Sequence, residues 1–185
     1  MYFTRLVLAI ALAAVSMSSM AHATRMPRIH VNNSTLSLIK QLEGFVSHPS
    51  PDPVGVPTVG YGHQCRQPGC TEITQRLPLS PEDADLLLRQ DIGSYVAALE
   101  MAVDSRVTMN DNQWGALVSW AYNVGTESVR HSELVRRLNQ GLNPETIVRQ
   151  ELPKWVSVNN IRLPGLVKRR AEEINLFLKT PSTRS

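Results

Sequence analysis

The sequence predicts a mostly helical α+β fold with a small sheet near the N-terminal end. Beyond residue 80, apolar residues recur at helical spacing. Residues 58–63 instead alternate as a strand does, directly after a segment with four prolines over 48–57 that excludes a helix. The chain has 185 residues, of which 42% are hydrophobic and 19% charged. These values are typical of one globular domain and exclude a largely disordered chain.

The charge balance and the cysteine content exclude several classes of protein. The formal net charge is only +3 and there is no long basic run, so we expect no nucleic-acid partner. Two cysteines cannot form a four-thiolate zinc site or a disulfide scaffold.

The first 23 residues have the pattern of a secretory signal. Arg5 precedes an apolar run over 6–15, and the small-residue triplet 21–23 is typical of a cleavage site. The sequence therefore predicts a signal peptide over 1–23, a single domain over 24–185 and a secreted protein. The alternative is an uncleaved anchor, although the apolar run is short for a membrane span and we expect no stable membrane insertion.

The first elements after a loose arm over 24–33 are a helix and a sheet. Ser34 or Thr35 is expected to cap a helix that runs to about Phe45. A hairpin or three-stranded sheet is expected over about 54–75, where glycines allow bends or close backbone approach.

The two cysteines flank a turn. Cys65 and Cys70 surround the dipeptide Pro68-Gly69, so they can meet across a tight loop, and in an oxidising compartment we expect a disulfide. The alternative is a metal site that adds His48 and His63 to the two thiols.

Helices are expected over the remainder of the chain. Ser80 at the N-cap, Pro81 at the first helical position and Asp83 two residues later open a helix over about 81–104, with Gly93 as a possible break. The next helix begins at Asn110 or Asp111, and others follow over about 131–140, 144–151 and 165–179.

Candidate chemistry concentrates between residues 43 and 63. Glu43 ends the first expected helix among apolar neighbours, Asp52 lies in the proline-framed loop, and Thr58 begins the strand. Hydrolysis of a glycosidic bond needs one carboxylic acid that protonates the leaving oxygen and one carboxylate on the other face of the sugar. An apolar setting keeps the acid protonated, which suits Glu43. Taken alone, the pair is also compatible with two solvated surface charges.

These residues belong to a longer motif, Glu43-x8-Asp52-x2-Gly55-x2-Thr58-x-Gly60-Tyr61-Gly62-His63. This motif resembles the catalytic stretch of the phage-type lysozymes, glycoside hydrolase family 24. Two later stretches, 110–125 and 163–172, are similar to the central and C-terminal helices of that family, so the resemblance covers about 35–178.

The resemblance implies a two-lobed, lysozyme-like fold with a sheet lobe over 34–80, a helical lobe over 81–179 and a substrate cleft between them. It also implies hydrolysis by inversion of the β-1,4 bond between N-acetylmuramic acid and N-acetylglucosamine in peptidoglycan. Glu43 is then the general acid, Asp52 orients or activates the water, and Thr58 assists it. No metal or organic cofactor is implied, the partner is a peptidoglycan glycan strand, and we expect a monomer.

Several further residues acquire candidate roles from the resemblance. Tyr122 is expected to pack on a sugar face and Asn123 to hydrogen-bond an acetamido group; the alternative for both is a helix C-cap. His63 is expected to form an ion pair with Asp91, and the alternative is a direct catalytic role.

The last expected helix carries two adjacent arginines. Either Arg169 or Arg170 is expected to pair with a carboxylate near the catalytic glutamate, and the alternative is a solvated basic face. Trp114, Trp120 and Trp155 are expected in the core, with the cleft border as the alternative for Trp155.

The export signal and the cysteine pair suggest an antimicrobial, bacteriolytic enzyme secreted by a fungus or another organism that attacks bacteria. The alternative from a different class is a non-catalytic wall-binding or membrane-active cationic protein on the same scaffold. Within the enzyme class, the alternative substrate is chitin, which shares the N-acetylglucosamine unit.

Overall fold

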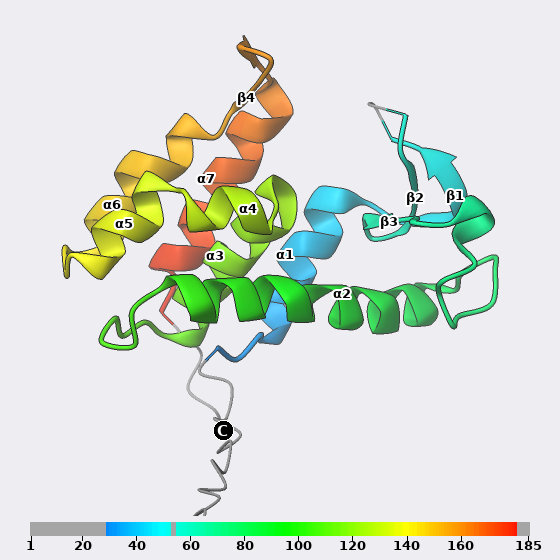
Figure 1. The fold of residues 1–185 in the computed structure, drawn as a ribbon, viewed down its shortest axis with the longest axis horizontal. Helices are drawn as coiled ribbons and strands as arrows, with labels where there is room; N and C mark the ends of the chain where they lie inside the picture. Colours follow the sequence, from blue (N-terminus) through cyan, green and yellow to red (C-terminus); the bar gives the residue numbers. More distant parts are fainter. Residues whose placement is uncertain (1–28, 53–54, 181–185) are drawn as a thin grey trace, which may run out of the picture.

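The computed structural model describes residues 29–52 and 55–180 (Figure 1). The predicted signal peptide and residues 24–28 of the predicted arm lie outside the described residues. The predicted α+β class is confirmed. The helices are α1 (Asn33–Glu43), α2 (Pro81–Ala102), α3 (Asp111–Val124), α4 (Thr126–Arg130), α5 (Glu133–Asn139), α6 (Pro144–Glu151) and α7 (Pro164–Leu178), with short 3-10 turns at Pro68–Cys70 and Leu152–Lys154.

The small sheet is antiparallel and has the order β1-β2-β3. Its strands are β1 (Val46–Pro51), β2 (Pro57–Gly60) and β3 (His63–Gln64). The sheet begins earlier than predicted, because β1 occupies part of the proline-rich segment. Proline cannot donate a ladder hydrogen bond, and β1 tolerates Pro49 and Pro51 because it is an edge strand.

Helix α2 links the sheet to the helical part of the molecule and runs beneath both in Figure 1. It begins as predicted, with the Ser80 hydroxyl accepting a hydrogen bond from the backbone N–H of Asp83 at 3.0 Å. It continues through Gly93 without the break that we considered. Among the described residues, no helix is both long and apolar enough to cross a membrane.

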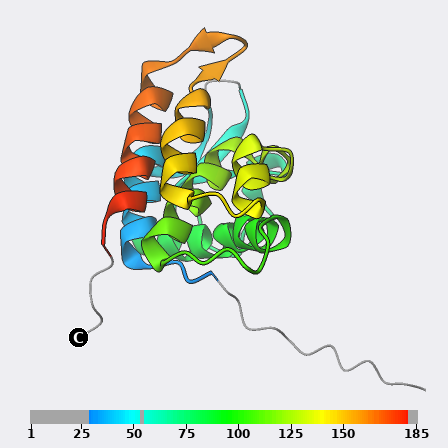
Figure 2. The same ribbon diagram turned by 90° about the vertical axis from the view of Figure 1, so that its left-hand side faces the viewer.

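Helix α3 is the centre of the core. Trp114 and Trp120 are buried as predicted, and α3 contacts α1, α2 and α7. Trp155 is half-buried and meets Trp120 edge-on, with ring centroids 5.4 Å apart. Figure 2 shows α7 beside α1 and α6. Because α7 also packs against α3, the last helix completes the layer of helices around the core.

The first helix differs from the prediction at both ends. Its N-cap is Asn32, and neither Ser34 nor Thr35, because the Asn32 side chain accepts a hydrogen bond from the Thr35 N–H at 3.0 Å. The same side chain donates to Asn112 Oδ1 at 2.8 Å and so ties α1 to α3. The helix ends at Glu43, before Phe45, since Gly44 adopts a φ of 74°.

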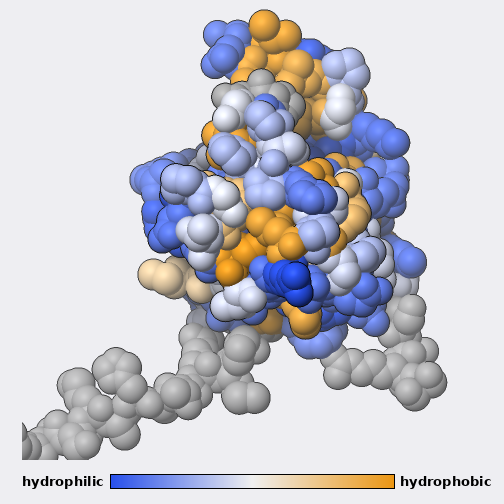
Figure 3. Space-filling model, turned by 90° about the vertical axis from the view of Figure 1, so that its right-hand side faces the viewer, coloured by the Kyte–Doolittle hydropathy of each residue, from blue (hydrophilic) through white to orange (hydrophobic). Residues whose placement is uncertain are grey.

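Two elements were not predicted. Helix α4 fills part of the interval before α5, which begins two residues later than expected. A hairpin of β4 (Ser157–Val158) and β5 (Ile161–Arg162) extends beyond the helices, and Figure 3 shows hydrophobic residues at this end of the molecule. Asn159 and Asn160 both have positive φ, which suits a two-residue hairpin turn. The Asn-Asn pair between two β-branched residues is the sequence signal that could have revealed it.

Two glycines in helices provide a matched test of packing. A Cβ added at Gly115 of α3 would clash with the Thr35 hydroxyl and lie 3.0 Å from the Thr35 Cβ, whereas a Cβ at Gly93 of α2 would meet nothing within 4 Å. We expect Gly115→Ala to lower the free energy of unfolding by about 2 kcal/mol. Gly93→Ala should raise it by about 0.5–1 kcal/mol. Urea unfolding of both variants checks this; equal effects would contradict the packing of α1 on α3.

Candidate active site

Glu43 lies where α1 stops and the chain turns into the sheet. Its Oε1 accepts a hydrogen bond from Arg169 Nη1 at 2.6 Å, and 21% of its side chain is exposed. Its other oxygen lies close to Gly62, where an added Cβ would be 3.0 Å from Oε2. The φ of Gly62 is 89°, so a residue without a side chain is needed there for both conformation and space.

Asp52 follows β1 and closes the turn toward β2. Its Oδ1 accepts the backbone N–H of Val56 at 2.8 Å, and its own N–H donates to the Val56 carbonyl at 2.8 Å. The carboxyl group is therefore held by the loop that carries it.

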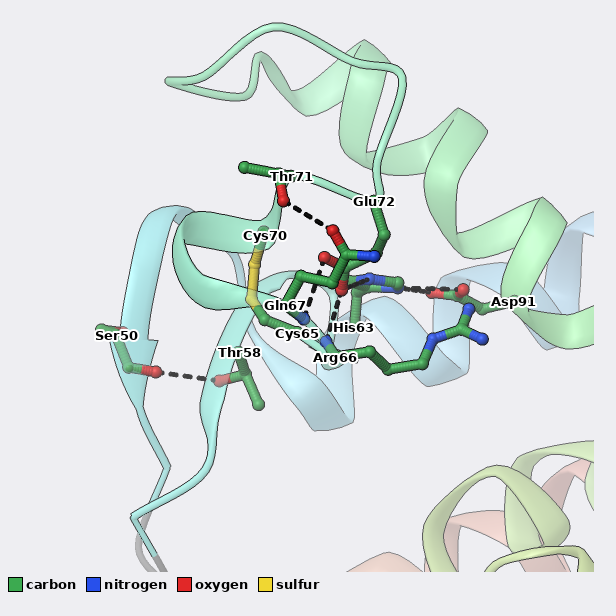
Figure 4. The surroundings of a disulfide bond; sticks show 10 residues. All are labelled: Ser50, Thr58, His63, Cys65, Arg66, Gln67, Cys70, Thr71, Glu72 and Asp91. Carbon is green, nitrogen blue, oxygen red and sulfur yellow. Dashed lines mark hydrogen bonds and ion pairs between the residues drawn. A yellow bond between two sulfur atoms is a disulfide. The ribbon is translucent and has the colours of Figure 1, made fainter.

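Thr58 lies in β2, directly opposite Ser50 of β1. Its hydroxyl donates to the Ser50 carbonyl oxygen at 3.3 Å (Figure 4). Glu43, Asp52 and Thr58 thus belong to one continuous unit of helix end, edge strand and second strand.

A pocket of about 420 Å³ lies beside this unit. Residues of β3, α2 and the end of α3 line it, and none of Glu43, Asp52 and Thr58 is among them; Glu43 adjoins it through Gly62. The lining residues are Gly62, His63, Gln64, Arg66, Asp91, Tyr95, Tyr122, Asn123, Val124 and Gly125.

Tyr122 and Asn123 both line this pocket, and neither caps α3, because Gly125 does so. The Tyr122 hydroxyl donates to the Tyr61 carbonyl oxygen at 2.9 Å, and burial raises the pKa of Tyr122. The Asn123 Oδ1 accepts a hydrogen bond from Arg170 at 2.8 Å. Their predicted roles toward a sugar remain predictions.

Both arginines of α7 are buried, so the alternative of a solvated basic face is wrong. Arg169 is the one that pairs with Glu43, and it also donates to the Ser119 carbonyl at 3.1 Å. Both arginines contact Glu173, which is fully buried. Sequence analysis missed Glu173, although its spacing of four and three residues from the arginines on one helix was the available signal.

The predicted ion pair between His63 and Asp91 is confirmed, at 3.0 Å. A second carboxylate, Glu72, lies 3.5 Å from the other ring nitrogen and was not predicted. Glu72 also accepts the backbone N–H groups of Arg66 and Gln67 (Figure 4). The hydrogen bond to Asp91 is the main cause that raises the pKa of His63, against the opposing effect of burial.

The predicted disulfide between Cys65 and Cys70 is present and closes the loop that Glu72 follows by two residues (Figure 4). Because both thiols are used, the alternative metal site with His48 and His63 is wrong. Within the described residues, no group of three or more His, Cys, Asp or Glu side chains is arranged to hold a metal ion.

The model of the phage lysozyme family matches residues 40–173, which is more than half of the chain. The chain belongs to the phage lysozyme family. The matched range includes Glu43, Asp52 and Thr58 as well as the buried charges of α7.

Relatives within the phage lysozyme family include endolysins. The endolysin of Acyrthosiphon pisum secondary endosymbiont phage 1 is 34% identical over 153 residues, which are 80% of this chain and 98% of that protein. The endolysin of Bacillus phage PZA is 31% identical over 151 residues, or 80% of this chain. This chain spans about half the length of some relatives, 55% for the phage PZA endolysin and 54% for that of Bacillus phage B103.

Solved structures of phage lysozyme relatives have the same fold. The muramidase domain of SpmX from Asticaccaulis excentricus aligns with a TM-score of 0.69 and 32% identity, over 83% of this chain and 100% of that one. A P22 lysozyme aligns with a TM-score of 0.68 and 26% identity, over 82% and 99%.

The contacts of His63 predict a pH-dependent contribution to stability. Its pKa is raised in the folded protein, so the stabilisation is full below its ordinary value of about 6.5 and is lost as the pH rises through the raised value. We expect His63→Asn to lower the melting temperature more at pH 5 than at pH 9.

The control is His131→Asn, since His131 pairs with Glu127 at an exposed site where ion pairs contribute little. A pH-independent loss of stability in His63→Asn would contradict the charge interaction and leave only packing as the cause.

Proposed function

We propose that this chain is a muramidase that hydrolyses the β-1,4 bond between N-acetylmuramic acid and N-acetylglucosamine in bacterial peptidoglycan. The observation that carries the proposal is the position of Glu43, a carboxyl group fixed by Arg169 at a helix end and adjoining a pocket, in a member of the phage lysozyme family.

In the proposed reaction, Glu43 donates a proton to the leaving glycosidic oxygen. Asp52 accepts a proton from a water molecule on the opposite face of the sugar, the water oxygen bonds to the anomeric carbon, and Thr58 helps to hold that water. Because the water attacks the face opposite the leaving oxygen in a single displacement, the anomeric configuration inverts. Inversion requires carboxyl groups about 6.5–9.5 Å apart, with room for the water between them.

The two carboxyl oxygens of Glu43 have different contacts, which suits them to different roles in the proposed reaction. Oε1 is held by Arg169, whereas Oε2 lies against the backbone of Gly62 beside the pocket. We assign the transferred proton to Oε2. After the transfer, the ion pair with Arg169 stabilises the carboxylate that remains.

We also propose that the enzyme is secreted. The basic residue, apolar run and small-residue triplet at the N-terminal end support export, and a disulfide suits an oxidising compartment. N-terminal sequencing of the protein recovered outside the producing cells should begin at residue 24. A protein that retains residues 1–23 in the membrane fraction would support the uncleaved anchor instead.

The test of the activity is Glu43→Gln. Gln keeps an oxygen that accepts the bond from Arg169 but cannot donate the proton, so we expect clearing of suspended bacterial walls to fall by about 10²–10⁴-fold with little change in fold. Glu145→Gln is the control, because Glu145 pairs with Arg149 at an exposed position of α6. Turbidity decrease and circular dichroism provide the two measurements.

The products of the wild-type protein separate the alternatives. Mass spectrometry of digested walls should find N-acetylmuramic acid at the reducing ends, whereas anhydro ends would indicate a lytic transglycosylase. Unchanged clearing by Glu43→Gln would favour the non-catalytic wall-binding or membrane-active protein. Faster degradation of a soluble chitin oligomer than of peptidoglycan would favour a chitinase.

A further inference from the structure

The two buried arginines of α7 contact two different helices, α1 and α3. Arg169 extends to Glu43, and its neighbour Arg170 extends to Asn123 at the end of α3. Glu173 lies between them, with Oε1 at 3.2 Å from Arg169 Nε and at 3.1 Å from Arg170 Nη2. One buried carboxylate therefore sets the positions of both arginines.

Burial of Arg170 is unfavourable in free energy, because its charged guanidinium group loses contact with water. It is 1% exposed, and burial lowers its pKa to about 10, which still leaves it charged at neutral pH. A buried ion pair adds little stability compared with well-packed apolar residues, so stability alone does not explain Arg170. The contact that remains to be explained is the one that it makes outside the charge cluster, with Asn123.

The chemistry of that contact fixes the orientation of the Asn123 amide. A guanidinium group only donates hydrogen bonds, so the amide oxygen must face Arg170. The amide NH₂ group then points away from Arg170. Asn123 is exposed and lines the pocket, so the pocket presents a hydrogen-bond donor with a fixed orientation.

A fixed donor selects a particular kind of ligand group. A sugar hydroxyl both donates and accepts, so it would be satisfied by either orientation of an amide. A carbonyl oxygen only accepts, and it needs the NH₂ group. The rings of Tyr95 and Tyr122, 5.0 Å apart, line the same pocket and offer an apolar surface for a methyl group.

We propose that Arg170 is a positioning residue that holds Asn123 as a hydrogen-bond donor for the acetamido carbonyl of a bound N-acetylated sugar. The inference rests on the proposed function, because it concerns how the same cleft recognises its substrate. Asn123 is the residue that touches the sugar, and Arg170 acts only through it.

The decisive variant is Asn123→Asp. It keeps an oxygen toward Arg170 and replaces the NH₂ group with a second acceptor. On N-acetylated walls, we expect KM to rise at least about tenfold with kcat within about twofold, since one hydrogen bond is replaced by a repulsive contact. On chemically de-N-acetylated walls the sugar carries an ammonium group, so KM should be equal to or lower than that of the wild type.

Two further variants test the part played by Arg170. Arg170→Lys keeps a positive charge but lacks the guanidinium fork, so it should raise KM on N-acetylated walls and add little to Asn123→Asp in the double variant. Arg149→Lys, at an exposed position of α6, is the matched control and should change neither KM nor melting temperature.

If Arg170→Lys fails to fold, stability measurements at position 123 test the same contact. Asn123→Leu removes the acceptor for Arg170 and should lower the melting temperature, whereas Asn123→Asp should not.

Three results would overturn the proposal: an unchanged KM in Asn123→Asp, a change in KM of equal size on both kinds of wall, or equal melting temperatures of the Asp and Leu variants. The two KM results presuppose an active wild-type protein, whereas the melting temperatures do not. A wild type inactive on both kinds of wall would instead refute the proposed function, so the two failures are distinguishable.

Discussion

The ion pair between Glu43 and Arg169 is the contact on which the rest of the site depends. It joins the end of the first helix to the last helix, across 126 positions of the chain. Removing charges from water costs several kcal/mol for each ion, and pairing offsets part of that cost. Arg169 pairs with both Glu43 and Glu173, and Arg170 pairs with Glu173. The proposed acid is thus held by a buried cluster, with no dependence on a flexible surface contact.

The sheet beside this cluster depends less on apolar burial than the helical part does. Among the residues that the structure describes, its own apolar core consists of five buried residues, which are Val59, Cys70, Leu79, Ala84 and Leu87. Polar and covalent contacts add the stability that so small a core cannot provide. The disulfide closes the loop after β3, Glu72 binds two amides of that loop, and His63 connects the loop to α2 through Asp91.

These two parts meet at the pocket, and they define its chemistry from opposite sides. From the sheet come the backbone of Gly62 and the paired His63; from α3 come the Tyr122 ring and the oriented Asn123 amide. At this boundary His63 and Asp91 are paired with each other, whereas Arg66 is exposed. The pocket therefore combines neutral polar groups with one ion pair and one exposed cation.

Much of the fold followed from local sequence signals. Ser80 and Pro81 begin α2, and α6 occupies the predicted range 144–151, because caps and backbone restrictions act within a few residues. The position of Glu43 at a helix end and the meeting of the two cysteines have the same local origin. Both ends of α1 were predicted wrongly. The helix already ends before Gly44, and its N-cap is Asn32, which also donates a hydrogen bond to Asn112 on another helix.

Tertiary structure alone decided which partners the charged groups found. Arg169 and Arg170 are adjacent and chemically identical, yet one reaches Glu43 and the other Asn123, because successive positions on a helix point about 100° apart and face different neighbours. Glu72 approaches His63 because the chain that follows the disulfide loop returns to β3. A sequence specifies which side chains can form ion pairs, but the distances that select among them exist only when the helices and loops have packed.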